Sequence, residues 1–265
     1  MRITLFTSNK NRHNYLINLL SKISEKLFVI QECESIFPDV IPGHHPTSEI
    51  MSEYFEKVNK AQFKLFGNSN ASNSRKNIKI LSMAHGDLNK CSLDFLSDFL
   101  KSDIYVIFGS SFIKGELIDY LVNQKAINIH MGVSPYYRGA DCNFWALYDN
   151  NPHLVGATIH LLSKGLDDGP MLYHAMSDIK IDPFEYTMST VKSAFNSISE
   201  RIKNKSIFEM KPVIQNKDNE IRYSKKIEFN EEIVKNYFKR EINLNSKAFD
   251  NSLLKEPFFL KSSSK

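Results

Sequence analysis

Short apolar runs alternate along the chain with segments whose apolar residues recur every three or four positions. The apolar runs have the length and composition of buried strands and lie at 2–8, 27–31, 78–82, 103–108 and 126–130. The segments with helical spacing lie at 12–27, 48–66, 93–100 and 115–123. Strands separated by helices predict a parallel sheet with helices on both faces. We therefore expect an α/β fold with a doubly wound, mostly parallel, Rossmann-like sheet.

The pattern is less regular in the second half of the chain. Strands are expected at 153–162 and 171–175, and a helix with one apolar face at 184–202. The remaining residues predict a strand pair near 212–224, a helix at 231–239 and a frayed polar tail that ends KSSSK. The expected organisation is a main domain over 1–205 and a small C-terminal extension over 206–265.

Charge and cysteine content narrow the class of protein. The 265 residues include 34 basic and 30 acidic side chains, a balance too even to indicate nucleic-acid binding. The three cysteines are far apart in the sequence, which indicates neither a disulfide framework nor a zinc site. No apolar run reaches the roughly 18 residues of a membrane span, and the N-terminus does not resemble a signal peptide. We expect a cytoplasmic protein without nucleic-acid or membrane partners.

Two polar residues stand at the end of the expected strand 126–130. Asn128 and His130 are two positions apart, which places both side chains on one face at the carboxyl edge of the sheet. Ligands of open α/β sheets bind at that edge. An Asn-x-His pair is nevertheless weak evidence alone, because polar residues at strand ends usually satisfy backbone groups.

A second polar element follows downstream. The strand that carries His160 runs into the turn 165–170 (GLDDGP), which can direct a carboxylate back across the sheet edge. Asp167 and Asp168 compete for this role, because adjacent residues in a turn point in different directions and only one can face the site. Between the two elements, the loop 131–145 contains the only Trp, Trp145, and has the glycines and proline of a substrate-binding loop.

Together these segments, INIHMGVSPYYRG…W…VGATIHLLSKGLDDGPM, resemble the catalytic core of the 10-formyltetrahydrofolate-dependent formyltransferases. That family includes methionyl-tRNA, glycinamide ribonucleotide and sugar-nucleotide N-formyltransferases. The resemblance implies a catalytic triad of Asn128, His130 and Asp167, and it favours Asp167 over Asp168. It is strong from 103 to 175 and makes 1–205 the formyltransferase catalytic domain. One departure is the loop after His130, where many members have Pro-Ser-Leu-Leu-Pro.

The resemblance also implies the binding mode of the formyl donor, 10-formyltetrahydrofolate. The pterin would lie between the strand-end segment 108–113 and the turn 163–168, bound mainly by backbone groups. The residues expected to contact it are Phe108, Gly109, Ser110, Ser111, Phe112, Ile113, Gly165 and Leu166. Formyl transfer requires no metal, and His44 and His45 lack further ligand-type partners at regular spacing, so we expect no metal site.

The implied chemistry gives each residue of the triad a role. Asn128 would donate an amide N–H to the developing oxyanion, an effect worth on the order of 3 kcal/mol. His130 would act as general base toward the amine, and Asp167 would orient the imidazole and raise its pKa. His160 is either a partner of Asp167 or a structural histidine.

The acceptor is less well specified by the sequence. Trp145 is a candidate substrate contact. Arg138 could hold an acceptor phosphate or pair with a carboxylate. Arg12 and His13 could bind an anionic acceptor or form a solvated helix start. About 60 residues follow the core without a marked basic patch, which disfavours tRNA. The loop SPYYRGADCNFW resembles the sugar-modifying members more closely.

The leading hypothesis is N-formylation of an amino sugar, nucleotide-linked, for surface polysaccharide biosynthesis. One alternative is a formyltransferase or hydrolase whose acceptor is another small molecule, such as a purine-pathway amine or water. Another is a catalytically idle folate- or nucleotide-binding protein. The apolar residues at 258–260 leave two possibilities open, packing on their own domain or contact with a second subunit in a homodimer.

Overall fold

The alternating pattern forms a single eight-stranded sheet. The computed structural model describes residues 1–33, 48–68, 75–242, 244 and 258–261, so His44, His45 and most of the KSSSK tail lie outside the described residues. The strands follow the order β10-β8-β7-β5-β4-β1-β2-β3. Their bounds are β1 Arg2–Ser8, β2 Lys26–Cys33, β3 Ile78–Ala84, β4 Ile104–Ile107, β5 Ile127–His130, β7 Ala157–Leu161, β8 Met171–Ser177 and β10 Phe258–Leu260.

The sheet is mostly parallel, which confirms the expected fold class. The five adjacent strands β3, β2, β1, β4 and β5 run parallel to one another. Strands β7 and β8 are antiparallel additions, and β10 pairs in parallel with β8. Parallel strands end at the same edge, so the residues that follow β1, β4 and β5 meet there.

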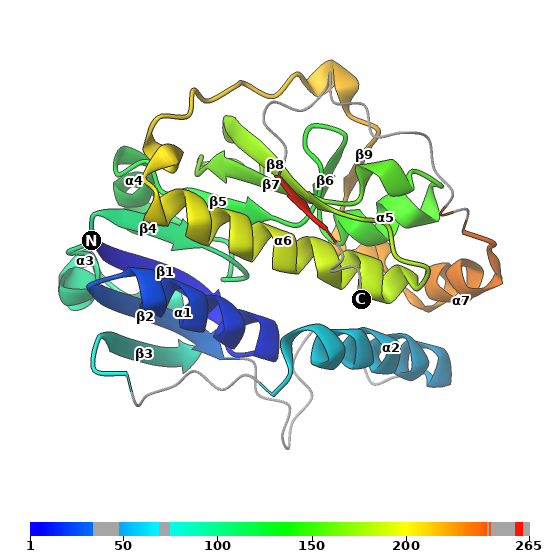
Figure 1. Ribbon diagram of the computed structural model, residues 1–265, viewed down its shortest axis with the longest axis horizontal. Helices are drawn as coiled ribbons and strands as arrows, with labels where there is room; N and C mark the ends of the chain where they lie inside the picture. The colour runs from blue at the N-terminus through cyan, green and yellow to red at the C-terminus, as the bar shows by residue number, and fades with distance from the viewer. Residues whose placement is uncertain (34–47, 69–74, 243, 245–257, 262–265) are drawn as a thin grey trace.

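Helices cover both faces of the sheet. Figure 1 shows α1 and α6 side by side over one face, where they pack on strands β1, β2, β7 and β8. The residues of α3 and α4 join β1, β2 and β4 in a separate core cluster. The helix bounds are α1 Asn11–Ile23, α2 Glu49–Phe66, α3 Leu93–Leu96, α4 Gly115–Asn123, α5 Cys142–Tyr148, α6 Pro183–Lys203 and α7 Glu231–Lys239.

Local sequence explains why α6 is the longest helix. It begins at Pro183, whose ring favours the first helical position, and the Asp182 side chain accepts hydrogen bonds from the backbone N–H groups of Phe184 and Glu185. Phe195 and Ile198, on the inner face, are fully buried against the sheet. Burial of this apolar face, rather than propensity alone, stabilises the helix.

A second core lies where α2, α5, α6 and α7 meet. The Tyr54 ring lies 5.3 Å from Phe184 and 5.3 Å from Phe229, both in edge-to-face contact. Phe66 is buried in the main core, whereas Phe55 and Phe63 on the same helix are exposed. The aromatic residues of α2 therefore divide between packing and the surface.

The strand pair expected near 212–224 is wrong. Val213 forms an isolated antiparallel bridge with Met171, and β9 (Arg222–Ser224) pairs in parallel with β6 (Tyr137–Gly139), a short strand that the apolar pattern does not reveal. Their polar composition carries no local pairing signal, so the sequence could not reveal these distant partners. The division at residue 205 stays a prediction.

Several boundaries also differ from expectation. The helix expected to reach Leu27 ends at Ile23, because Leu27 is already in β2 and fully buried. The strand expected from 153 starts at Ala157, after a short 3-10 turn that begins at Pro152. The residues of β10 pack on the sheet of their own chain.

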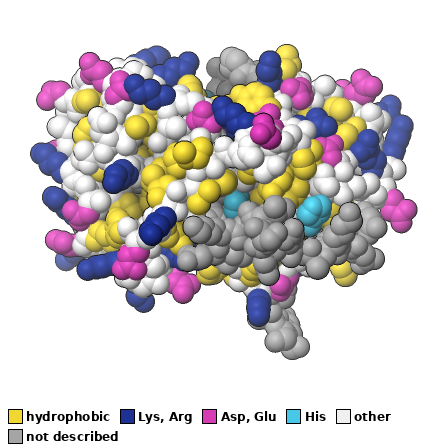
Figure 2. All heavy atoms as spheres, turned by 90° about the horizontal axis from the view of Figure 1, so that it is seen from above, with side chains coloured by type: hydrophobic (Ala, Val, Ile, Leu, Met, Phe, Trp, Pro, Cys, Tyr) yellow, Lys and Arg dark blue, Asp and Glu magenta, His cyan; other side chains and the backbone are white. Residues whose placement is uncertain are grey.

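The described surface mixes both signs of charge. On the face drawn in Figure 2, Lys and Arg side chains are interspersed with Asp and Glu, and hydrophobic side chains lie between them. Within the described part of the chain, no helix combines the length and the apolar character needed to cross a membrane.

Candidate active site

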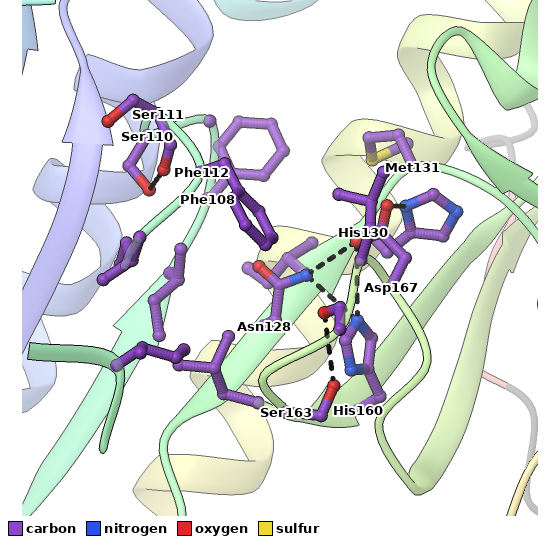
Figure 3. Close-up of a pocket in the computed structure, with 18 of the residues that line it drawn as sticks. Phe108, Ser110, Ser111, Phe112, Asn128, His130, Met131, His160, Ser163 and Asp167 are labelled. Carbon is purple, nitrogen blue, oxygen red and sulfur yellow. Dashed lines mark hydrogen bonds and ion pairs between the residues drawn. The ribbon is translucent and has the colours of Figure 1, made fainter. Parts of the chain in front are cut away.

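A cavity of about 380 Å³ lies at the carboxyl ends of β1, β4 and β5. One wall is the segment 107–113 after β4, and the other combines the end of β5 with the turn 162–167. Figure 3 shows Asn128, His130, His160 and Asp167 converging on one side, with Phe108, Ser110 and Ser111 on the other. The cavity thus lies where the sequence places the site.

The three residues of the expected triad lie within contact of one another. Asn128 Nδ2 lies 3.3 Å from Asp167 Oδ1, and His130 Nδ1 lies 3.3 Å from Asp167 Oδ2. The second ring nitrogen of His130, Nε2, lies 3.3 Å from the carbonyl oxygen of Tyr137. A single carboxylate therefore contacts both strand residues, one through each oxygen.

His160 is part of the same network. It stands opposite Asn128 in the antiparallel pairing of β5 with β7 and is 1% exposed. Its Nδ1 lies 2.8 Å from the Leu161 carbonyl oxygen, which can only accept, so Nδ1 carries the proton. Burial lowers the pKa of His160 to about 4, against the raising effect of Asp167. The ring is therefore neutral, and its Nε2 accepts from Asn128 Nδ2 at 2.9 Å.

This arrangement engages the side-chain amide of Asn128. One amide hydrogen points to His160 Nε2 and the other to Asp167 Oδ1, so both are engaged within the network. The bond to Asp167 is the longer one and therefore the weaker. We expect this N–H to be the one redirected when an oxyanion develops in the cavity.

The electrostatics favour a charged His130. Burial alone would lower the pKa of His130, but Asp167 and then Cys142 raise it, and the net pKa lies well above its usual range. Burial alone would raise the pKa of Asp167, yet His130, His160 and Arg138 hold it below its usual value. Both shifts favour an imidazolium–carboxylate pair, and the two ring nitrogens of His130 contact a carboxylate oxygen and a carbonyl oxygen, which both accept.

The turn that holds Asp167 has an unusual backbone. Asp167 has φ of 49°, in the left-handed region that a residue with a Cβ adopts only at a cost. The neighbouring Asp168 points into the turn, where its carboxylate accepts a hydrogen bond from Ser163. Asp167 faces the cavity and Asp168 does not, as the resemblance implies.

The opposite wall of the cavity is held by two side chains that the sequence analysis missed. Glu32, at the end of β2 and fully buried, accepts hydrogen bonds from Ser111 N at 2.6 Å and Ser111 Oγ at 2.8 Å. Asn89 donates to the Phe112 carbonyl at 3.0 Å and accepts from Lys114 N at 2.8 Å. An acidic residue at the carboxyl end of a strand was the available signal for Glu32.

All eight residues expected to contact the donor border this cavity. Phe108, Gly109, Ser110, Ser111, Phe112, Ile113, Gly165 and Leu166 line it. Gly109 has φ of 71°, and a Cβ there would lie 2.7 Å from His13 Nε2, so only glycine fits. The structure brings the two expected donor-binding segments face to face.

Arg12 and His13 also border the cavity, from the start of α1. Arg12 donates to Gln62 Oε1 at 2.6 Å. The His13 ring is buried 5.0 Å from the Phe108 ring, and burial, with Arg12 and Lys10, places its pKa well below the usual range. Arg12 therefore brings a positive charge to this side of the cavity, while burial favours a neutral His13.

Arg138 and Trp145 lie outside the lining of this cavity, and their expected substrate contacts stay predictions. Arg138 is buried, pairs with Glu220 at 3.0 Å and donates to the Leu166 carbonyl at 3.1 Å, so it pairs with a carboxylate. Trp145 is 2% exposed inside the second core, with the Arg222 guanidinium 4.3 Å from its ring centre. Both side chains are buried in contacts within the protein.

Within the described residues, His, Cys, Asp and Glu form no cluster of three with metal-binding geometry. The titratable groups near the cavity contact one another and backbone groups instead.

Two buried histidines predict a stability that depends on pH. Burial lowers the pKa values of His160 and His174 to about 4, whereas an unfolded histidine titrates near 6.5. Between these values the unfolded chain binds more protons, so the free energy of unfolding falls as pH drops from about 6.5 to about 4. The loss is on the order of 3 kcal/mol for each histidine. The raised pKa of His130 makes its full contribution to the free energy of unfolding throughout this pH window.

Urea unfolding at several pH values between 7.5 and 5 measures this slope. His174→Gln, which keeps an N–H for the Ser134 carbonyl that His174 contacts at 2.8 Å, is expected to flatten it. The exposed His85→Gln is the matched control. Equal slopes for all three proteins would contradict the prediction.

Comparison with known sequences matches residues 92–207 to the formyl transferase family. A methionyl-tRNA formyltransferase from Thermosynechococcus vestitus is 34% identical over 90 residues, which are 34% of this chain and 27% of that enzyme. The one from Microcystis aeruginosa is 29% identical over 132 residues, or 49% of this chain and 40% of the enzyme. The chain thus matches less than half the length of these relatives.

Solved structures of similar fold cover more of the chain. A sugar N-formyltransferase from a Shewanella species aligns with a TM-score of 0.53 and 15% identity, over 86% of this chain and 78% of its own. An N-formyltransferase from Helicobacter canadensis, in complex with folinic acid and dTDP-3-aminofucose, aligns with a TM-score of 0.52 and 13% identity, over 94% and 78%. At these identities the likeness establishes the fold.

Proposed function

We propose that this chain, whose residues 92–207 match the formyl transferase family, transfers a formyl group from 10-formyltetrahydrofolate to a primary amine. The observation that carries the proposal is the contact of Asp167 with both Asn128 and His130 at the edge of the cavity. This contact joins a hydrogen-bond donor, a proton carrier and an orienting carboxylate.

The proposed chemistry follows from the protonated state of His130. The amine nitrogen attacks the formyl carbon, the bond from that carbon to the donor nitrogen breaks, and one proton passes from the amine to the donor nitrogen. His130 gives its proton to the departing nitrogen and takes one from the amine, so it returns to its starting state. Asp167 stabilises the charged ring, and the imidazolium charge together with the Asn128 amide stabilises the negative charge that develops on the formyl oxygen.

The cavity has the character that a pterin ring requires. Phe108, Ile113 and Leu166 supply apolar surface, and the backbone of 109–112 approaches the cavity without a side chain at Gly109. Pockets of this kind bind planar ligands through apolar walls with a few polar groups that fix orientation. Glu32 and Asn89 hold one wall in place before a ligand arrives.

We infer that the acceptor is a nucleotide-linked amino sugar used in surface polysaccharide biosynthesis. We place the formyl transfer in the cytoplasm. The loop 134–145 resembles the sugar-modifying formyltransferases, and the Helicobacter canadensis protein of the same fold holds dTDP-3-aminofucose. Arg12 at the cavity supplies a positive charge that suits a phosphate. Another small amine, or water, is the alternative acceptor for the same site.

The experiment is incubation of the purified protein with 10-formyltetrahydrofolate and a panel of amino-sugar nucleotides that includes dTDP-3-aminofucose, with products identified by mass spectrometry. Formylation of a panel member, lost in Asn128→Ala and His130→Ala, supports the proposal. Formate release without a formylated product would indicate a hydrolase. Calorimetric binding of folinic acid without any turnover would indicate an idle binding protein.

A further inference from the structure

The chain returns to the turn of Asp167 after α6. We call residues 213–224 the returning segment. Its first residue, Val213, forms two backbone hydrogen bonds of 2.8 Å with Met171, and its last three residues form β9. The segment lies beyond the part of the chain that matches the formyl transferase family. It nevertheless contacts the backbone on which the Asp167 carboxylate depends.

The central contact is made by Gln215. Its side chain is 6% exposed, and Nε2 lies 2.9 Å from the Asp167 carbonyl oxygen and 2.8 Å from the Gly169 carbonyl oxygen. An amide nitrogen carries two hydrogens, so each carbonyl receives one. Because both partners can only accept, the amide has one productive orientation, with its oxygen turned away.

The turn requires such support. Asp167 is held at φ of 49°, a conformation that persists in a residue with a Cβ only where the surroundings impose it. Gly169 allows no side chain, because a Cβ there would lie 1.8 Å from the Leu161 carbonyl oxygen. The turn therefore packs closely on β7 on one side, and Gln215 holds its backbone by hydrogen bonds on the other.

Arg138 adds a second attachment. It donates to the Leu166 carbonyl at 3.1 Å and pairs with Glu220 of the returning segment at 3.0 Å. The carbonyls of Leu166, Asp167 and Gly169 are thus all held by two buried side chains. A shift of this backbone would move the Asp167 carboxylate away from its 3.3 Å contacts with Asn128 and His130.

We propose that Gln215 is a positioning residue of the formyl transfer site, which fixes the turn backbone so that the Asp167 carboxylate faces His130 and Asn128. The inference deepens the proposed function and rests on it for the rate of transfer. The carboxylate raises the pKa of His130 only while it stays close to the ring, so the titration of His130 reports its position directly.

The test is Gln215→Met, which keeps the length of the side chain and removes both donors. The titration of His130 is followed by NMR in the ligand-free protein. Since the chain has eight histidines, the His130 signal is assigned with His130→Gln. We expect the pKa of His130 to fall relative to the unsubstituted protein. We also expect kcat for formyl transfer to fall by about tenfold to a hundredfold, as for a small displacement of a catalytic group.

Ile214→Ser is the matched control, because Ile214 is the adjacent residue and is 83% exposed. It is expected to leave both readouts unchanged. If Gln215→Met does not fold, Gln215→Asn, whose amide is one methylene too short to reach both carbonyls, is expected to shift the titration in the same direction. An unchanged His130 titration in a folded Gln215 variant would overturn the inference. A shifted titration in a protein without transferase activity would support the positioning role while refuting the proposed function.

Discussion

Replacing Asp167 by Asn is expected to move the titration of His130 to lower pH and to remove most of the activity. Without the carboxylate, burial becomes the dominant influence, so the pKa of His130 falls from well above 6.5 to below it. The imidazole is then neutral at pH 7 and has no proton to give. A loss of about 10²- to 10⁴-fold in kcat corresponds to the removal of general acid–base catalysis.

Rates measured as a function of pH for the two proteins test this expectation. The limb of the profile that marks loss of the His130 proton lies well above pH 6.5 in the unsubstituted protein and shifts to lower pH in Asp167→Asn. The exposed Asp94→Asn, which removes a carboxylate outside the cavity lining, is the control. A profile in Asp167→Asn that retains its original limb would show that His130 does not depend on this carboxylate.

Replacing Phe195 by Ala is expected to cause a large loss of stability. The Phe195 side chain is fully buried, and its ring lies 4.8 Å from Phe108, 6.2 Å from Phe66 and 6.5 Å from Tyr15. Removing it leaves a cavity between α6 and the sheet, which costs about 3–5 kcal/mol in the free energy of unfolding. That is a large share of the roughly 5–15 kcal/mol that stabilises a typical domain.

Urea denaturation measures this loss when all proteins are fitted with one common dependence of the free energy of unfolding on urea concentration. The matched control is Phe95→Ala, since the Phe95 side chain is 61% exposed and its removal is expected to cost less than about 1 kcal/mol. Because the Phe195 ring supports Phe108 at the cavity wall, folinic acid binding should also weaken in Phe195→Ala and not in Phe95→Ala. Similar midpoints for the two variants would argue against a central packing role for Phe195.

The parallel half of the fold could be predicted because its strands are local and apolar. Ile3, Leu5 and Phe6 are interrupted only by the β-branched Thr4, and such a short, mostly apolar run indicates a strand covered on both faces. The short strand β6 carries Arg138 and pairs with β9, so that Gly139 stands opposite Ser224, 85 residues further along the chain. No periodicity within three residues can signal such a partner.

The candidate site divides in a similar way. Asn128, His130 and Asp167 are recognisable because their order and spacing match a known family, and the structure brings their side chains together. The sequence predicted that Asp167 raises the pKa of His130, but not whether this effect outweighs burial, because burial depends on the folded structure. Gln215 gave no signal either, because a single glutamine in a polar segment is ordinary until the fold places it beneath the turn.

The antiparallel pairing of β5 with β7 has a consequence for how the protein acquires activity during folding. Asn128 stands opposite His160 across this pair, and the next residues on the same face are His130 and Thr158. In a strand, a slip of one residue turns every side chain to the opposite face. A misaligned β7 would remove His160 from Asn128 and carry the Asp167 turn out of position. Molecules trapped in that register would keep their helices yet be inert, so recovered activity after refolding measures correct strand alignment more sensitively than circular dichroism.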